Sequence, residues 1–68
     1  MNFQQANARA AEIKQQNPKL IVGAAMIDGE FVIITGKNRR RLNTYARGGK
    51  VAYEFVGNKL MSFSLSVF

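Results

Sequence analysis

The sequence predicts an α+β domain in which an N-terminal helix packs on an antiparallel β-meander of four to five strands. Apolar residues at helical spacing near the start of the chain indicate the helix. β-branched runs separated by glycine-containing turns indicate the strands. The length of 68 residues leaves room for one domain, residues 1–68, with a small core. A strongly bent or barrel-like sheet is one way for so small a sheet to cover its own second face.

The helix is predicted from Asn2 to Gln16. Asn2 can act as the N-cap, with Gln5 in the partner position of a capping box. Pro18 ends the helix, because the residue before a proline is pushed towards extended geometry. The apolar positions recur at steps of three and four residues and therefore share one face: Phe3, Ala6, Ala10 and Ile13.

The chain after the helix alternates strand-forming runs with turns. Asp28 and Gly29 separate the first two runs, and both residues tolerate the positive φ that a type I′ hairpin turn needs. This two-residue turn pairs Met26 with Phe31. Later glycines mark further turns. The predicted strands lie near residues 19–27, 30–36, 39–47, 50–56 and 60–67.

The first hairpin is apolar on both faces. Its turn pairs Ala24 with Ile33 on one face and Ala25 with Val32 on the other. One helix covers only one face, so the second face must meet strands that curve over it or another chain. Gly23 is small enough to allow a helix or a partner backbone to approach closely. From this we predict a homodimer in preference to a closed barrel.

Residues 39–47 support two interpretations. A strand is preferred, because a Gly-Gly turn after it pairs Leu42 with Phe55 and leaves one apolar face. The alternative is a short helix that Asn38 caps and that ends at Gly48. Consecutive arginines are good helix formers, which favours the alternative.

The register of the last hairpin depends on the length of its turn. A three-residue turn from Gly57 to Lys59 places Met61 and Phe63 on the same face as Phe55. A two-residue turn places them on the opposite face, because a slip of one residue reverses every side chain. The three-residue turn is predicted, since it gathers the apolar side chains on one face.

The excess positive charge belongs to one stretch of the chain. Residues 36–50 hold six of the ten Lys and Arg residues and no acid. The other four cations equal the four acids in number, so the whole net charge of +6 belongs to this stretch. Such a pattern indicates a basic patch rather than general solubilisation. Its cations are Lys37, Arg39, Arg40, Arg41, Arg47 and Lys50.

This basic stretch predicts binding to nucleic acid, either DNA or RNA. In the strand interpretation one face carries Arg39, Arg41, Asn43, Tyr45 and Arg47, and the serines of the last strand share it. Arginines neutralise phosphates, an exposed aromatic ring can stack on a base, and hydroxyls donate hydrogen bonds. Arg39, Arg41 and Arg47 are expected on phosphates, Tyr45 on a base. The predicted interface residues are Lys37, Arg39, Arg40, Arg41, Tyr45, Arg47 and Lys50.

A protein-interaction module or inhibitor is the alternative function. Its basic face would dock on an acidic surface of a partner protein. Compact, basic chains without cysteine are also common among phage-encoded proteins that modulate host enzymes, which fits this alternative.

The residue inventory argues against an enzyme. The chain has no Cys and no His, so disulfides, thiolate chemistry and the usual zinc ligands are absent, and no nucleophile–base motif is visible. We therefore expect no catalytic residue, no cofactor and no metal site. The polar N-terminus lacks the apolar region of a signal peptide, and no apolar run approaches the roughly 20 residues of a membrane span. A cytoplasmic protein without a membrane partner is predicted.

Overall fold

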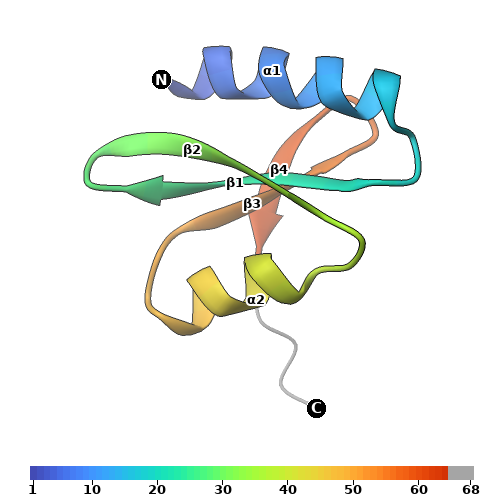
Figure 1. Cartoon of the computed structure of the whole chain (residues 1–68). Coiled ribbons are helices and arrows are strands. Elements are labelled where there is room, and N and C mark those ends of the chain that lie inside the picture. Colours follow the sequence, from blue (N-terminus) through green and yellow to red (C-terminus); the bar gives the residue numbers. More distant parts are fainter. Residues whose placement is uncertain (65–68) are drawn as a thin grey trace.

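A four-stranded antiparallel sheet lies between two helices in the computed structural model, which describes residues 1–64 (Figure 1). The predicted α+β class with an N-terminal helix is therefore confirmed. No helix within the described residues is long and apolar enough to cross a membrane. In chain order the elements are α1 (Phe3–Gln16), β1 (Ile21–Ile27), β2 (Glu30–Gly36), α2 (Arg40–Arg47), β3 (Ala52–Val56) and β4 (Lys59–Phe63).

The sheet consists of two hairpins placed side by side, in the order β2-β1-β3-β4. A meander would place β3 next to β2, whereas here β3 pairs antiparallel with β1 in the centre of the sheet. The helix α2 carries the chain from the edge strand β2 to this central position (Figure 1). The sheet is open, with β2 and β4 at its edges, so the barrel-like expectation is wrong. The reason is that residues 40–47 form a helix and supply no fifth strand to close it.

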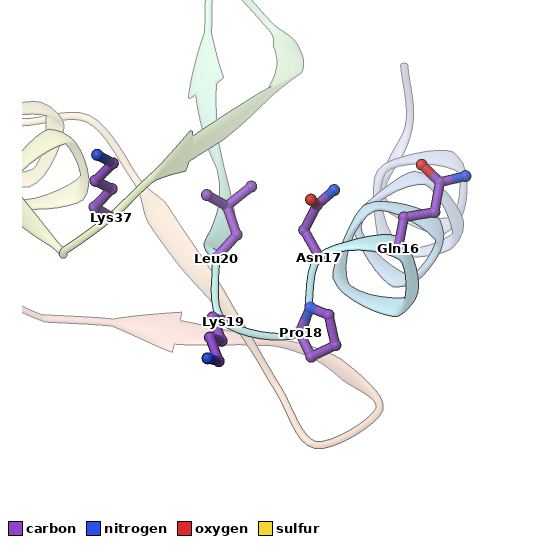
Figure 2. A pocket seen from close by; sticks show the side chains of 6 residues that line it. All are labelled: Gln16, Asn17, Pro18, Lys19, Leu20 and Lys37. Atoms are coloured by element: carbon purple, nitrogen blue, oxygen red, sulfur yellow. The ribbon is translucent and has the colours of Figure 1, made fainter.

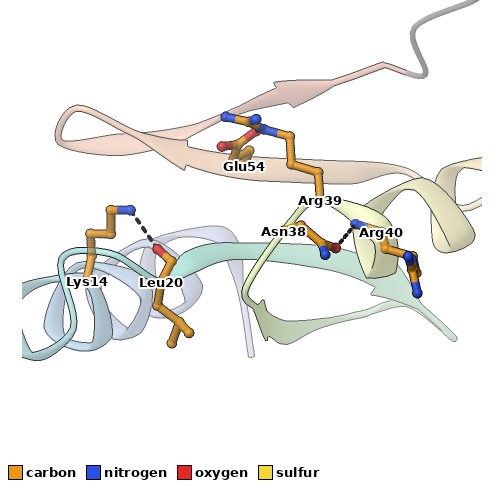
Figure 3. Close-up of polar contacts among 6 residues, drawn as sticks. All are labelled: Lys14, Leu20, Asn38, Arg39, Arg40 and Glu54. Carbon is orange, nitrogen blue, oxygen red and sulfur yellow. Dashed lines mark hydrogen bonds and ion pairs between the residues drawn. The ribbon is translucent and has the colours of Figure 1, made fainter.

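The helix α1 forms as the sequence predicts. Asn2 is its N-cap, and its side-chain Oδ1 accepts a hydrogen bond from the Gln5 backbone N–H at 2.8 Å. The Gln5 side chain accepts in return from the Asn2 backbone N–H at 2.9 Å, which completes the capping box. At the other end, Lys14 Nζ donates to the carbonyl oxygen of Leu20 at 2.6 Å and ties the helix to the start of β1 (Figure 3).

The first hairpin has the predicted register, with Met26 paired to Phe31. Asp28 and Gly29 have φ values of 51° and 80°, which are the two positive angles of a type I′ turn. The turn sequence therefore sets which side chains of β1 and β2 share a face of the sheet.

The last hairpin has a two-residue turn, so the predicted three-residue turn is wrong. Phe55 pairs directly with Leu60, and both side chains are buried on the α1 side of the sheet. Met61 and Phe63 consequently point to the opposite side, where Phe63 packs against the core beneath α2. The prediction failed because it assumed that only one face of β4 needed apolar side chains. Of the predicted strand 60–67, residues 65–67 lie outside the described residues.

The α1 face of the sheet holds the larger of the two cores. Phe3, Phe31 and Tyr53 add an aromatic cluster at the N-terminal end of α1, with ring centroids 5.6–5.7 Å apart. These separations fall in the range of favourable edge-to-face and tilted ring pairs. The buried members of this core are Ala6, Ala10, Val22, Ala24, Phe55 and Leu60.

The other face is covered by α2 of the same chain. Leu42 lies at the centre of this second core and packs on Ala25 and Ile34. Gly23 makes the close approach possible, because a Cβ atom there would meet the Tyr53 carbonyl oxygen and lie 2.9 Å from Leu42 Cδ2. The apolar face that suggested a homodimer is therefore covered within one chain by α2, although Val32 on it stays 41% exposed, so the main reason for a dimer no longer holds.

Candidate nucleic-acid interface

The basic stretch folds as the helix α2, so the predicted strand over 39–47 is wrong and the alternative helix is right. Leu42 buries its side chain on the sheet, which gives the helix its inner face. Asn38 Oδ1 accepts a hydrogen bond from the Arg40 backbone N–H at 2.9 Å and shapes the entry into the helix (Figure 3). Arg39 occupies the N-cap position itself, without a capping bond from its side chain.

The helix regroups the basic side chains. Residues three and four positions apart share a helix face, so the alternating set predicted for a strand does not lie on one surface. The face opposite Leu42 instead carries Arg40, Thr44 and Arg47, with Asn43 on its flank. Together with the start of the helix these residues surround a hollow of about 600 Å³. Among residues 1–64, its lining contains no carboxylate and consists of Asn38, Arg39, Arg40, Asn43, Thr44 and Arg47.

Arg39 is the one arginine of this hollow that meets a carboxylate within residues 1–64. Its Nε donates to Glu54 Oε1 at 2.7 Å, across from the start of α2 to the central strand β3 (Figure 3). This hydrogen bond, with the charge of Glu54, raises the pKa of Arg39 further above its usual value. Glu54 is largely enclosed, with 13% of its side chain exposed, whereas 57% of the Arg39 side chain stays exposed. Glu54 thus offsets one positive charge and leaves the rest of the guanidinium open to solvent.

Arg41 lies on the side of α2 that faces the sheet edge. Its Nη1 donates to the carbonyl oxygen of Thr35 on β2 at 3.3 Å. A second, smaller hollow runs along this flank, between Arg41, Arg40, Thr44 and Tyr45. The guanidinium therefore adds charge to the edge of the interface and also covers part of the open edge of β2.

Tyr45 and the serines contribute less to the surface than the sequence predicts. The Tyr45 side chain is half-buried and packs against the core that contains Leu42, so part of its ring is already in contact with the protein. Ser62 pairs with Tyr53 and points to the α1 side of the sheet, away from α2. Ser66, from the same predicted row of serines, lies outside the described residues.

The two lysines lie beyond the ends of α2. Lys37, in the loop before the helix, lines a different hollow of about 440 Å³ beside Leu20 and Lys19 (Figure 2). Lys50 follows the helix, and its backbone N–H donates to the carbonyl oxygen of Tyr45 at 3.0 Å. Both side chains are exposed and extend the positive field without lining the main hollow.

The structure therefore brings together Arg39, Arg40 and Arg47, with Arg41 at their side. Thr44 and Glu54 were missed as contributors to this site. The helical spacing of the alternative interpretation would have found Thr44, whereas no local signal links Glu54 to Arg39, fifteen residues away. Comparison with protein-family models, with curated proteins and with solved structures found no match. The function is therefore argued from this surface alone.

Proposed function

We propose that the protein binds nucleic acid through the outer face of α2. Arg40 and Arg47 contact phosphates from the two ends of the face, and Arg39 and Arg41 support them from its sides. The observation that carries this proposal is the hollow around α2, which, among the residues that the structure describes, is lined by arginine and uncharged polar side chains and by no acid.

The chemistry of this surface suits phosphate. Guanidinium groups donate paired hydrogen bonds that match phosphate oxygens, and they stay charged at any physiological pH. The net charge of +6 is concentrated around this one helix, which favours rapid association with a polyanion. Within residues 1–64, the salt bridges are Arg9–Glu12 and Arg39–Glu54, so Arg40 and Arg47 enter none there.

The same surface lacks the features of a protein-binding interface. Protein interfaces depend on large apolar or aromatic anchors at their centre, with charges at the rim. Within residues 1–64, none of the exposed large apolar side chains belongs to α2. They are Met1, Phe3, Val32, Val51, Val56 and Met61. Val32, Val56 and Met61 lie on the α2 side of the sheet but not on the helix itself. The outer face of α2 is polar, which favours nucleic acid over an acidic protein as its partner.

A salt titration with matched charge variants tests the proposal. Arg40→Gln combined with Arg47→Gln is expected to weaken binding to a fluorescent oligonucleotide about tenfold at about 50 mM salt. The salt dependence, as log K against log salt, should become shallower by roughly 0.9 for each phosphate that the protein no longer neutralises. The control removes the same charge elsewhere, with Arg9→Gln on α1 and Lys59→Gln at the start of β4. It is expected to change affinity much less.

Two results would count against this function. Equal weakening by the two double variants would mean that binding follows total charge rather than α2. No binding to DNA or RNA at low salt would end the proposal. Partner proteins retained from a nuclease-treated lysate would then support the interaction-module alternative.

The homodimer is a separate proposal that needs another surface, because α2 occupies the face that first suggested it. Val56 and Met61 are exposed apolar side chains on the second hairpin, on the α2 side of the sheet beyond the helix itself, and could form such a contact. Sedimentation at micromolar concentration tests it directly. A mass of 7.6 kDa would show a monomer, and twice that value a dimer.

A further inference from the structure

We infer that the nucleic acid is double-stranded DNA, that α2 lies in its major groove, and that Asn43 reads the edge of a base. This inference rests on the proposed function and adds the class of nucleic acid and one specificity-determining residue. Three features of the structure carry it: the shape of the basic element, the position of its aromatic ring, and the order of side chains along the helix.

The basic element is an exposed helix of a size that fits the groove. An α-helix with its side chains is about 10–12 Å across, and the eight residues of α2 give it a length of about 12 Å. The major groove of B-form DNA is about 12 Å wide and admits a helix, whereas the major groove of double-stranded RNA is too narrow for one. One side of α2 rests on the sheet and the other faces away from it, so the helix can enter a groove without moving (Figure 1).

Single strands are a poorer match to this surface. Proteins that bind single strands stack bases on exposed aromatic side chains along a basic groove. The aromatic residue of α2, Tyr45, is half-buried against Leu42 and Ile34. The exposed ring of Phe3 belongs to α1, which covers the other face of the sheet. The basic helix and an exposed stacking ring are therefore on opposite sides of the protein.

The order of side chains along α2 matches what a groove presents. Arg40 and Arg47 are separated by seven residues, about 10.5 Å along the axis, so their long side chains can reach phosphates from the two ends of the helix. Along the axis Thr44 and Asn43 lie between them, with Thr44 on the outer face and Asn43 on its flank, from which its side chain can reach a base edge. Thr44 Oγ1 donates to the carbonyl oxygen of Arg40 at 2.9 Å, which leaves its methyl group for contact with thymine.

Asn43 is the residue best suited to discriminate bases. Its amide carries both a donor and an acceptor, the pair that recognises adenine in the major groove. Within residues 1–64 the Asn43 side chain makes no hydrogen bond, so both groups are available to a ligand. The side chain lines the hollow between the arginines of α2.

The class of nucleic acid is tested by competition. A labelled DNA duplex of about 20 base pairs is displaced by unlabelled DNA duplex, by one of its single strands, or by an RNA duplex of the same sequence. We expect the DNA duplex to compete at least about tenfold better than the other two. Methylation of guanine N7, which blocks the major groove, should weaken binding, and a ligand of the minor groove should not.

The role of Asn43 is tested by selection from a duplex pool with randomised bases. The wild-type protein is expected to enrich a preferred base pair, and Asn43→Ala to lose that preference while keeping its affinity for unselected DNA. For the selected duplex the loss should be about tenfold. Gln15→Ala, which removes an exposed amide from α1, serves as the control and should leave both the preference and the affinity unchanged.

The possible failures are distinguishable. Equal competition by the three nucleic acids would overturn the inference and leave the proposed function in place. Enrichment that is identical for wild type and Asn43→Ala would remove the reading role of Asn43. Absence of binding to every nucleic acid would overturn the proposed function as well.

Discussion

The two helices cover opposite faces of one sheet and differ in almost every physical property. The helix α1 has a complete capping box, two fully buried alanines and an aromatic cluster at its start. The helix α2 buries one large side chain, Leu42, and has no capping bond from the side chain of its N-cap. The α1 side therefore supplies most of the packing, whereas the α2 side carries the charge.

The charge at the start of α2 opposes helix formation, whereas Arg47 lies in the last turn, where the helix dipole favours a cation. Arg39, Arg40 and Arg41 lie at the N-terminal end of the helix, where the aligned backbone dipoles are positive and disfavour cations. No acid occupies the first turn, and Glu54 offsets only Arg39. A natural helix that breaks such a local rule is expected to do so for function rather than for stability. Arg39 and Arg40 also line the hollow, so the unfavourable charge placement and the hollow belong to the same surface.

The largest effect is expected where the two layers meet, at Gly23. A Cβ atom at this position would collide with the backbone of Tyr53 and crowd Leu42, so Gly23→Ala must push β1 and β3 apart or lift α2 from the sheet. We expect a loss of at least about 2 kcal/mol in the free energy of unfolding, measured by urea denaturation.

Gly48→Ala is the matched control. Gly48 has a φ of −79°, and an added Cβ would lie 3.5 Å from its nearest neighbours, so ordinary side chains are tolerated. Its stability should change by less than about 1 kcal/mol. If Gly23→Ala were as stable as Gly48→Ala, the close packing of α2 on the sheet would be refuted.

The hydrogen bonds at the two helix N-termini allow a second comparison of stability, with smaller expected effects. Asn2→Ala removes one half of the capping box with Gln5 and is expected to lower stability by about 1 kcal/mol. Asn38→Ala removes a single bond to the Arg40 backbone at the start of α2 and should cost about 0.5 kcal/mol. Thermal unfolding of both variants measures the difference. A larger loss of stability for Asn38→Ala would mean that side-chain hydrogen bonds stabilise the start of α2 more strongly than the start of α1.

Local signals predicted the α1 side of the molecule well. Asn2 and Pro18 bound the helix, and the Asp28-Gly29 pair sets the register of the first hairpin, without help from distant residues. The positive surface could also be located from charge alone, because no acid interrupts residues 36–50.

The α2 side could not be predicted in the same way, because its structure depends on contacts between distant residues. Residues 40–47 become a helix because the apolar second face of β1 and β2 needs a cover, and Gly23 lets Leu42 approach it. The register of the last hairpin follows from this, since Phe63 is required beneath α2. The pair of Arg39 with Glu54 depends in turn on β3 lying next to β1.

The smallest expected change in stability is an increase, and the same substitution should lower the affinity for nucleic acid. Arg40→Glu places an anion in the first turn of α2, where the helix dipole favours it, and relieves repulsion from Arg39 and Arg41. Stability should therefore rise by about 0.5 kcal/mol, while affinity for nucleic acid falls by more than the loss seen with Arg40→Gln. Urea denaturation and a salt titration on the same preparation measure both quantities. A variant that lost stability and affinity together would show that Arg40 holds the fold, and the division between a packing layer and a charged layer would then be wrong.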